Sequence, residues 1–366
     1  MNRRKAFKDI LHHKTPDRVI LDLGGCPLSG MDGRITEKML KFYGFRTYEE
    51  ILQELDIDTR GVGWILNPQK SQVRTLSNSA FIDAWGIKRE FSGLYWDITE
   101  SPLNGATVDD LENYPWPDAE SVSTDEINQI VQSAKYLYEE TDYIICASHP
   151  VFGIFELGCW MCGFEDFMLK MAAEPEFVHC FFEIILNYQK KVIELYYDKL
   201  GKYIHYTSSG DDFATQASTM MSPAMFDEFI APYFKERISY TKQFTDAPYL
   251  HHSCGNVYKI IPSLIDCGVD ILNPIQPCAK EMEAANLKKT YGDKIVFHGG
   301  FDTQEILPFG SREEIESEVE ELLTDMMPKG GYIFAAAHNI QDDVPVENVD
   351  IIFKAARNFK LERCKN

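Results

Sequence analysis

Short apolar segments alternate with longer amphipathic segments along most of this 366-residue chain. Most of the short segments are apolar at nearly every position and rich in β-branched or aromatic residues. That pattern is typical of parallel strands, because both faces of such strands are buried. It predicts eight strands, at residues 18–24, 57–64, 143–149, 203–210, 248–254, 270–275, 295–300 and 332–338.

Helical patterns fill the intervals between the predicted strands. Apolar residues recur at three- and four-residue spacing in residues 311–327 and 346–359, for example, and the glycines of "DCG" and "PKGG" stop helices before the next strand. Repeated alternation of strand and helix predicts an α/β fold. We expect a single (β/α)8 TIM barrel that forms one domain over residues 1–366.

One segment departs from this alternation. Within residues 65–118, apolar and polar residues alternate as they do in half-buried antiparallel strands, and "YPWPD" then marks the return to helix. We predict a β-hairpin or meander, inserted after the second strand of the barrel and lying near the barrel mouth.

Polar and ionisable residues gather at the carboxyl ends of the predicted strands, which is where barrels of this kind carry their active sites. We expect His149, Asn273, Asp302 and Gln341 to bind substrate. Asp211, Asp212 and Gln276 are the candidates for catalysis.

The stretch "HHSCGN" predicts a metal site. His252 and Cys254 are two residues apart at the end of the fifth predicted strand, so their side chains point the same way, and Gly255 permits a tight turn. Zinc takes about four ligands and accepts sulfur, imidazole nitrogen and carboxylate oxygen. We predict His338 as a third ligand and Glu156 as a further oxygen ligand. If His338 only hydrogen-bonds to the barrel rim, Glu156 or Asp211 takes the third place.

Three further features have structural alternatives. Asp211 or Asp212 either acts on the substrate or caps a helix that begins near residue 213. Cys159 and Cys162 have the spacing of a redox or metal pair, although their segment is typical of a helix that faces the core. His251 should point away from His252 and pack against its neighbours.

Charge and composition exclude several function classes. The chain has 36 Lys and Arg against 57 Asp and Glu, a formal net charge of −21, which disfavours nucleic acid and anionic lipid as partners. No apolar run reaches the ~18 residues of a membrane helix. Nine cysteines without the spacing of a disulfide framework predict reduced thiols and a cytoplasmic location, and would suit an oxygen-poor cytoplasm.

From about residue 5 to 360 the chain resembles the uroporphyrinogen decarboxylase superfamily. The resemblance rests on the order and spacing of eight blocks: "HHKTPDRV", "FIDAWGI", "EPEFV", "GDDFATQ", "MSPAMFDEFIAPYFK", "HHSCGNVYKIIPSLIDCGVDILNPIQP", "YGDKIVFHGGFD" and "HNIQDDVPVENV". It implies a (β/α)8 barrel. True decarboxylases of this superfamily act on a tetrapyrrole with several carboxylates and carry an Arg-rich signature of the "RQAGRY" type. The corresponding stretch here, "LDLGGCPLSGMDGRI", has Arg34 as its one basic residue. Several carboxylates need several cationic partners, so porphyrinogen decarboxylation is not expected.

The chain is more similar to the cobamide-dependent methyltransferases of the superfamily, which include methylcobamide:coenzyme M methyltransferase and methyltransferase components of anaerobic O-demethylases. The resemblance implies a zinc ion held by a His-x-Cys pair and a later Cys. His252 and Cys254 match that pair, and His338 stands where the later Cys would be. A neutral imidazole in place of a thiolate makes the metal a stronger Lewis acid, which suits an ether, hydroxyl or amine leaving group.

These features together predict a zinc-dependent methyltransferase that moves a methyl group between a small methylated molecule and a corrinoid. The corrinoid is either free or bound to a partner protein. Two alternatives remain open: a decarboxylase or lyase of a small carboxylate or tetrapyrrole, and a non-catalytic barrel that binds a corrinoid or tetrapyrrole.

Overall fold

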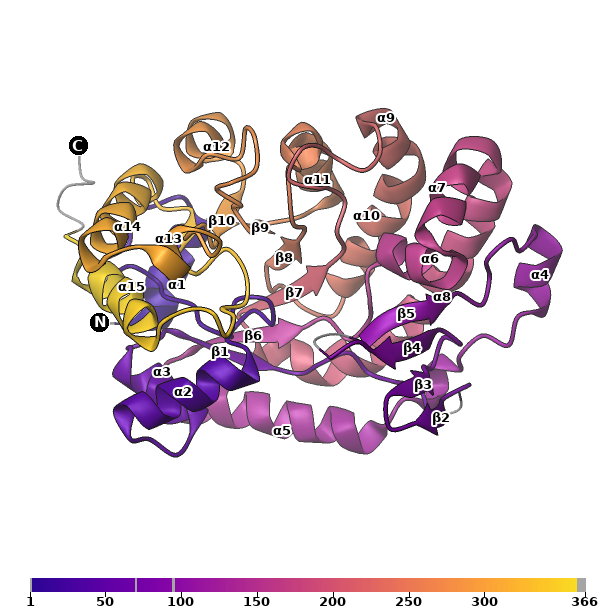
Figure 1. Cartoon of the computed structure of the whole chain (residues 1–366), viewed down its shortest axis with the longest axis horizontal. Coiled ribbons are helices and arrows are strands. Elements are labelled where there is room, and N and C mark those ends of the chain that lie inside the picture. Colours follow the sequence, from indigo (N-terminus) through magenta and orange to yellow (C-terminus); the bar gives the residue numbers. More distant parts are fainter. Residues whose placement is uncertain (1, 70, 94–95, 361–366) are drawn as a thin grey trace.

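The computed structural model describes residues 2–69, 71–93 and 96–360. Its centre is a curled parallel sheet of seven strands in the order β1-β6-β7-β8-β9-β10-β11 (Figure 1). Each strand lies within one of the predicted segments but is shorter. The strands are β1 (Thr59–Val62), β6 (Ile144–Ser148), β7 (Tyr206–Gly210), β8 (Tyr249–His252), β9 (Ile271–Asn273), β10 (Val296–His298) and β11 (Tyr332–Ile333).

Residues 20–22 lie between the two edges of this sheet, where the first strand was expected. The Asp58 N–H donates to the Leu21 carbonyl (3.0 Å) beside β1, and the Asp22 N–H donates to the Phe334 carbonyl (2.9 Å) beside β11. Leu21 and Phe334 form a parallel bridge. The predicted α/β fold is confirmed. The sheet is a curled parallel sheet of seven strands where eight barrel strands were expected, because the expected strand 18–24 is reduced to this short pairing with both edges.

Side chains alternate across the strands, and one face of the sheet changes from apolar to polar along its length. An apolar cluster on this face includes Ile20, Leu250, Ile271 and Val296, and helix α1 packs against it. Two residues further along each of these segments, the same face carries Asp22, His252, Asn273 and His298, because side chains of a strand point to one side at every second residue. The candidate site lies at this polar level.

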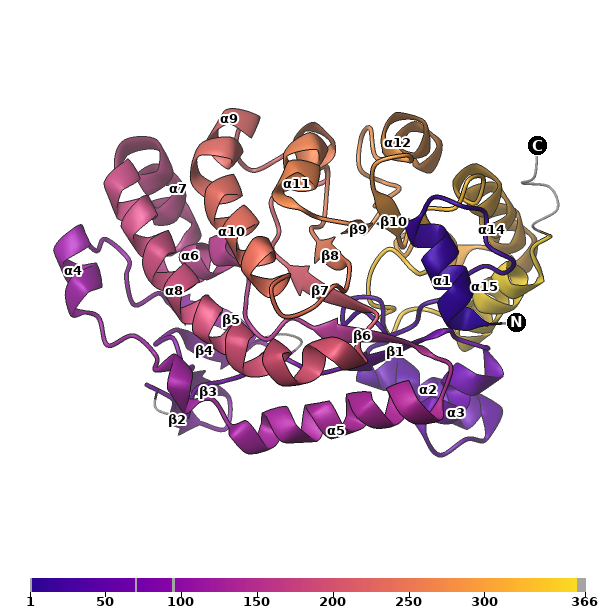
Figure 2. The ribbon, with the colours of Figure 1, turned by 180° about the vertical axis from the view of Figure 1, so that it is seen from behind.

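Helices cover the outside of the sheet, and α5 contacts β1, β6 and the long helix α8 (Figure 2). In the described part of the chain, no helix combines the length and apolarity that crossing a bilayer requires. The helices are α1 (Arg3–Leu11), α2 (Gly33–Tyr43), α3 (Tyr48–Glu54), α4 (Val108–Asn113), α5 (Thr124–Glu140), α6 (Ile154–Cys162), α7 (Phe164–Ala173), α8 (Pro175–Leu200), α9 (Pro223–Met225), α10 (Ala231–Thr241), α11 (Ile261–Cys267), α12 (Ala284–Tyr291), α13 (Ile306–Phe309), α14 (Arg312–Met326) and α15 (Val346–Asn358).

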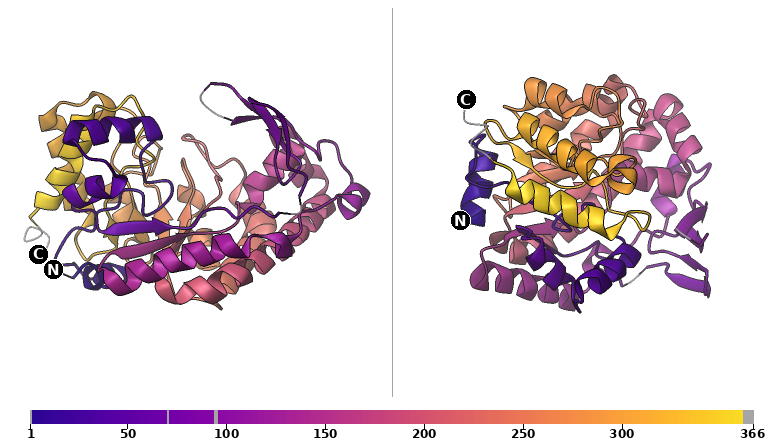
Figure 3. Two further views of the ribbon diagram at one scale, coloured as in Figure 1. Left: turned by 90° about the horizontal axis from the view of Figure 1, so that it is seen from below. Right: turned by 60° about the vertical axis from the view of Figure 1, so that its left-hand side comes forward.

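A second, antiparallel sheet interrupts the alternation between β1 and β6. Its strands β2 (Arg74–Ser77), β3 (Ala80–Ile82), β4 (Lys88–Phe91) and β5 (Trp96–Glu100) pair in sequence order. Figure 3 shows this sheet at the end of the molecule opposite α14 and α15. Ile98 of β5 lines a cavity together with Glu156 and Asp212, so the antiparallel sheet contributes a wall beside the candidate site.

An ion-pair network beside the amino end of β1 joins segments from the two ends of the chain. The fully buried Asp58 carboxylate contacts Arg3 (3.1 Å), Arg18 (2.6 Å) and Arg357 (2.8 Å). Burial raises the pKa of Asp58 more than the arginines lower it. The carboxylate therefore depends on these three cations for its charge.

Candidate metal centre and active site

Three of the four predicted metal ligands come together at the carboxyl end of the sheet. His252 ends β8, Cys254 follows two residues later, and His338 lies beyond β11. One ligand atom from each lies within 4.8 Å of those of the other two. The Cys254 Sγ is 3.3 Å from Nε2 of His252. These three residues, which we call the His-Cys-His cluster, are the one group of three or more metal-binding side chains found among the described residues.

The turn after Cys254 is held by contacts that favour glycine at the next position. Gly255 has φ of +85°, and a Cβ there would lie 2.5 Å from the Thr215 carbonyl oxygen. The Cys254 N–H donates to Asp212 Oδ1 (2.7 Å), and the Gly255 N–H donates to Gln276 Oε1 (2.7 Å). Asp212 and Gln276, predicted as catalytic, thus fix the backbone that carries Cys254.

A chain of buried hydrogen bonds runs from His252 across the sheet. Nδ1 of His252 is 2.5 Å from Oδ1 of Asn273, Nδ2 of Asn273 is 2.7 Å from Nδ1 of His298, and Nε2 of His298 is 2.7 Å from Oδ2 of Asp22. Asp22 and His298 are both 0% exposed. Burial disfavours the Asp22 carboxylate, but His298 and two hydroxyls outweigh it and lower the pKa of Asp22. We call these four residues the tautomer chain.

The direction of each hydrogen bond in the tautomer chain follows from the Asp22 charge. A carboxylate only accepts, so Nε2 of His298 donates to it. Nδ2 of Asn273 can only donate, so Nδ1 of His298 accepts from it. The Asn273 oxygen then accepts from Nδ1–H of His252. The remaining ring nitrogen, Nε2, carries a lone pair and faces Cys254. Histidine ligands are oriented in this way in metal sites generally.

Burial sets the protonation of the His-Cys-His cluster. It lowers the pKa of His252 to about 4, against the opposing effect of Asp212, and it also lowers the pKa of His338. Both imidazoles are therefore neutral at pH 7, the form that binds metal. Burial, together with the charges of Asp212 and Glu156, raises the pKa of Cys254 to about 12, so the residue is a thiol until a cation displaces its proton.

Asp211 caps a different helix from the one predicted for it. Its two carboxylate oxygens accept the N–H groups of Phe155 (3.0 Å) and Glu156 (2.8 Å), in the first turn of α6. A Cβ at Gly153 would lie 2.3 Å from the Asp211 carboxyl carbon, so the close approach needs this glycine. Residues 213–222, all within the described chain, form a loop rather than a helix that Asp211 or Asp212 could cap.

Two other carboxyl groups lie beside the cluster. Asp212 Oδ1 is 3.8 Å from Nε2 of His252, close enough for this carboxylate to be considered as an oxygen ligand. Burial and the charges of Asp211 and Asp212 raise the pKa of Glu156 to about 8, so Glu156 is mostly protonated at pH 7 in the absence of a cation. Glu156, predicted as the fourth ligand, lines cavities on both sides of α6.

Two cavities flank the His-Cys-His cluster. His252 lines a largely apolar cavity of about 370 Å³ between the ends of β6 and β7, together with Glu156, Phe152 and Trp64. Cys254 and His338 line a second cavity of about 370 Å³, which differs from the first in that Asp302 and several hydroxyl and amide side chains contribute to its lining. The cluster therefore separates two compartments of different character, which we call the apolar cavity and the polar cavity.

The four residues predicted to bind substrate are placed differently. His149 lines the apolar cavity and hydrogen-bonds through Nε2 to Thr241 (3.2 Å). Asn273 has both polar atoms of its side-chain amide, Oδ1 and Nδ2, engaged in the tautomer chain. Asp302 lines the polar cavity but accepts three backbone N–H groups before α13. Gln341 is exposed and donates to the Asn339 carbonyl (3.0 Å).

Cys159, Cys162 and His251 occupy structural positions. The two cysteines are buried in α6 with free thiols, and burial raises the pKa of both. The His251 ring packs against Phe213 and Phe234, with ring centroids 5.4 and 4.5 Å away. The interpretation of all three as packing residues therefore agrees with their surroundings.

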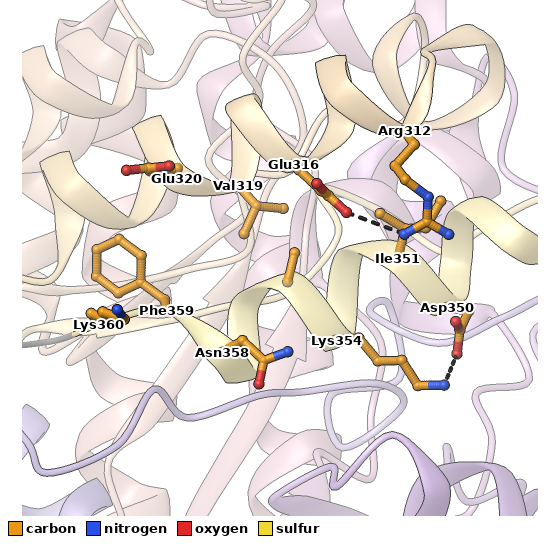
Figure 4. A pocket seen from close by; sticks show the side chains of 11 residues that line it. Arg312, Glu316, Val319, Glu320, Asp350, Ile351, Lys354, Asn358, Phe359 and Lys360 are labelled. Carbon is orange, nitrogen blue, oxygen red and sulfur yellow. Dashed lines mark hydrogen bonds and ion pairs between the residues drawn. The ribbon is translucent and has the colours of Figure 1, made fainter.

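A further cavity of about 550 Å³ lies away from this site, between α14 and α15 (Figure 4). Its rim carries the ion pairs Arg312–Glu316 (3.1 Å) and Lys354–Asp350 (2.7 Å). Its lining residues include no His or Cys. The opposite charges compensate one another, so the groove offers no comparable chemistry.

Sequence reasoning missed Asp22 and His298. Each is one ionisable residue in a short run that is otherwise apolar, "VILDLG" and "IVFHGG". That contrast was the available signal, because a charged group inside a buried strand needs a partner. The partner itself could not be identified, since 276 positions separate the two residues.

Comparisons with known proteins identify relatives of this chain. The model of the uroporphyrinogen decarboxylase (URO-D) family matches residues 97–359. Uroporphyrinogen decarboxylase 2 of Oryza sativa is 24% identical over 197 residues, 52% of this chain and 46% of that protein. The uroporphyrinogen decarboxylase of Pseudoalteromonas atlantica is 22% identical over 293 residues, 76% of each protein. For the first of these relatives, the match spans about half of the relative's length.

Among solved structures, a methyltransferase from Methanosarcina mazei has the same fold. It superimposes with a TM-score of 0.64 at 16% sequence identity, covering 97% of this chain and 98% of that one. At this level of identity the likeness concerns the fold alone.

Proposed function

The chain belongs to the uroporphyrinogen decarboxylase (URO-D) family, and from this premise we propose that it is a zinc-dependent methyltransferase. It would move a methyl group between a small molecule and a corrinoid carried by a partner protein. The His-Cys-His cluster is the observation that supports this proposal. The name of the structural neighbour, a methyltransferase, agrees with it.

The donor set suits zinc. Bonds of about 2.1 Å to nitrogen and 2.3 Å to sulfur in a tetrahedral site place the two ligand atoms about 3.6 Å apart. The Sγ–Nε2 separation of Cys254 and His252 is 3.3 Å. His252, Cys254 and His338 would hold the ion. Three protein ligands leave a position for substrate, as catalytic zinc sites require.

A zinc ion at the cluster would act as a Lewis acid on the heteroatom that bears the methyl group. His252 offers the lone pair of Nε2 because Asn273 holds the ring through Nδ1. Cys254 releases its thiol proton on binding. Burial and two neighbouring carboxylates raise the pKa of Glu156, and its position on the wall of the cavity that His252 also lines would let it protonate the leaving heteroatom.

The electrons balance in the direction from small molecule to corrinoid. The bond between the methyl carbon and the heteroatom breaks, and its electron pair stays on the heteroatom. A reduced corrinoid that acts as methyl acceptor would supply the electron pair for the new bond to the methyl carbon. The heteroatom takes a proton from Glu156, and the small molecule leaves in its demethylated, protonated form.

Decarboxylation of a small carboxylate is the second candidate. Relatives carry that name, and burial raises the pKa values of Asp211 and Glu156, so either can hold a proton. The distribution of charged side chains favours methyl transfer over decarboxylation, because a substrate carboxylate needs a cationic partner. Arg34 is 58% exposed and pairs with Asp32, and no Lys or Arg lines the apolar cavity.

Metal analysis of purified protein tests the proposal. We expect wild-type protein to hold about one zinc ion per chain and His252→Ala to lose most of it, because two ligands rarely retain zinc. His251→Ala is the matched control, since the neighbouring ring packs on the other side of the strand. Wild-type protein with no more than trace metal after growth in zinc would contradict the proposal.

Spectral titration distinguishes the reactions. Incubation with cob(I)alamin and a methyl donor should give the methylcobalamin spectrum. Tight corrinoid binding without methyl transfer would instead support a binding barrel. Release of CO2 from a carboxylate substrate would support the decarboxylase.

A further inference from the structure

The segment that carries His338 is held by different partners on its two sides. Before His338, the Ala337 N–H donates to the Phe301 carbonyl (2.9 Å), which continues the pairing of β10 with β11. After His338, the Ile340 N–H donates to the Gly30 carbonyl (2.9 Å). His338 itself lies in a bend between these two contacts. Its backbone is therefore fixed by two anchors and not by a strand.

The second anchor includes a side chain. Oδ1 of Asn339 accepts the Gly30 N–H (2.7 Å), while the Gly30 carbonyl accepts from Ile340. The buried Gly30 thus uses both of its backbone polar groups on residues 339 and 340. The bond from Asn339 is the one that a substitution can remove while the backbone stays the same.

The loop that contains Gly30, residues 24–32, is a firm support for this contact. Near its start, the Asp22 carboxylate accepts the N–H groups of Gly25 (2.7 Å) and Cys26 (3.2 Å). The same carboxylate accepts the hydroxyl of Ser29 (2.6 Å), the residue before Gly30. A buried carboxylate that gathers three donors fixes the loop to the interior of the sheet.

The two histidines of the His-Cys-His cluster differ in what holds their rings. Nδ1 of His252 is held by Asn273. The ring of His338 meets the ring of His252 at a centroid distance of 5.6 Å and has no hydrogen-bond partner among the described residues. Histidines that bind metal usually have an outer partner that orients the ring. The orientation of His338 depends instead on its backbone.

We propose that Asn339 is a positioning residue for the metal site. Its hydrogen bond to Gly30 fixes the backbone that directs the His338 ring toward His252 and Cys254. The inference rests on the proposed metal site and adds a residue that acts through one of the ligands. It also links the third ligand to substrate binding, because the loop of Gly30 supplies part of the wall of the apolar cavity: Cys26, Pro27 and Leu28.

Asn339→Leu tests this role, because leucine has a similar size and no acceptor. Zinc affinity, measured by competition with a chromophoric chelator, should fall about tenfold, the low end of the effect of losing an outer partner of a histidine ligand. Asn348→Leu is the matched control: its amide, also half-buried, donates to the Leu307 carbonyl of α13 (2.9 Å). The control should lower the melting temperature and leave zinc affinity unchanged. Wild-type affinity in folded Asn339→Leu, or an equal loss in both variants, would overturn the inference.

Relaxation of the 15N nuclei of the histidine rings in metal-free protein separates positioning from a loss of stability. In wild-type protein both rings of the cluster should be ordered. In Asn339→Leu the His338 ring should gain motion on the ps–ns timescale, while the His252 ring stays ordered with its proton on Nδ1. Asn339→Asp keeps an oxygen for the Gly30 N–H and should keep the His338 ring ordered. Unchanged order of His338 in Asn339→Leu, or an equal gain of motion in both rings, would contradict the proposed role.

The zinc content of wild-type protein separates this inference from the proposed function. Wild-type protein without zinc would contradict the proposed function, and the ring measurement on metal-free protein would still decide the role of Asn339. Wild-type protein that holds zinc, together with Asn339→Leu that binds it equally well, would retain the metal site and refute the role of Asn339.

Discussion

Substitution of Asp22 by Asn should weaken zinc binding although Asp22 is three hydrogen bonds away from the metal site. The Asp22 carboxylate accepts from Nε2 of His298 (2.7 Å). In the Asp22→Asn variant, an amide that donated at this position would force His298 to carry its proton on Nδ1. The Asn273 amide would then have to rotate, and Nδ1 of His252 would become an acceptor. The proton of His252 would move to Nε2, the nitrogen that faces Cys254.

The size of the effect follows from what the metal must undo. To bind zinc through Nε2, His252 would have to carry its proton on Nδ1 again, and the hydrogen bonds of the tautomer chain would have to return to their wild-type directions. The introduced amide would then lose its hydrogen bond to His298, which costs roughly 1–3 kcal/mol. Since 1.36 kcal/mol is a factor of ten, a cost of roughly 1–3 kcal/mol means that zinc affinity should fall about 5–150-fold. Loss of an outer partner of a metal-binding histidine has effects of the same order.

Thr59→Val is the matched control. The Thr59 hydroxyl also donates to Asp22, at the other carboxylate oxygen. Its removal costs stability of about 1 kcal/mol but leaves the direction of the tautomer chain unchanged. Both variants should therefore have lower melting temperatures, and only Asp22→Asn should lose zinc affinity.

Zinc competition with a chromophoric chelator measures the affinity, and 15N NMR of the histidine rings reports which nitrogen of His252 is protonated. We expect Nδ1–H in wild-type protein and Nε2–H in metal-free Asp22→Asn. A folded Asp22→Asn protein with wild-type zinc affinity and an Nδ1–H proton on His252 would refute the reasoning.

Three other variants test separate parts of the structure. His338→Ala should remove most of the metal-dependent rise in melting temperature, because ligand binding energy is folding energy, and His338→Cys should restore it with a preference for softer metals; unchanged metal content in the first variant would exclude His338 as a ligand. Asp58→Ala should lower the free energy of unfolding by about 3–5 kcal/mol, since it leaves three arginines without their buried partner, and a loss below about 1 kcal/mol in denaturant titration would contradict this. Burial and the charge of Arg4 lower the pKa of His205 to about 4, below its ordinary value of about 6.5, so the stability it contributes is present above about pH 6.5 and lost as the pH falls toward about 4. His205→Gln should therefore reduce the pH dependence of stability in this window by up to about 1.4 kcal/mol per pH unit, and identical slopes would refute it.

The parts of the fold that depend on local pattern could be predicted from the sequence. All seven strands of the sheet lie within the predicted segments, and most of these segments are apolar runs, since a parallel strand is buried on both faces. The pairing of His252 with Cys254 could be predicted for a similar reason: residues two apart on a strand share a face. His338 could be predicted to lie near this pair because the carboxyl ends of parallel strands meet at one edge of the sheet.

What the sequence could not supply depends on register and on contacts between distant segments. Asn273 was expected to bind substrate, yet the register that pairs His252 with Asn273 commits its amide to the tautomer chain. Asp211 was expected to act on the substrate or to cap the next helix along the chain. It instead binds the first turn of α6, more than fifty positions earlier. Capping rules identify a suitable residue, but which helix it caps is decided by the packed fold.

The distribution of hydrogen bonds over the site argues for metal binding over direct acid–base catalysis. Asp22 and Asn273 hold His252, Asp212 and Gln276 hold the turn of Cys254, and Asp211 holds α6. Apart from Glu156, the polar groups that would be expected to act on a substrate are thus occupied in positioning backbone or rings. Nε2 of His252 and Sγ of Cys254 contact mainly each other, and the ring of His338 meets that of His252 at a centroid distance of 5.6 Å. The thiol sulfur and the two neutral imidazole nitrogens are not engaged in positioning other groups. They are suited to bind a metal ion and less suited to carry protons. This arrangement supports the proposal that the reactive group of the site is one that the three side chains bind together.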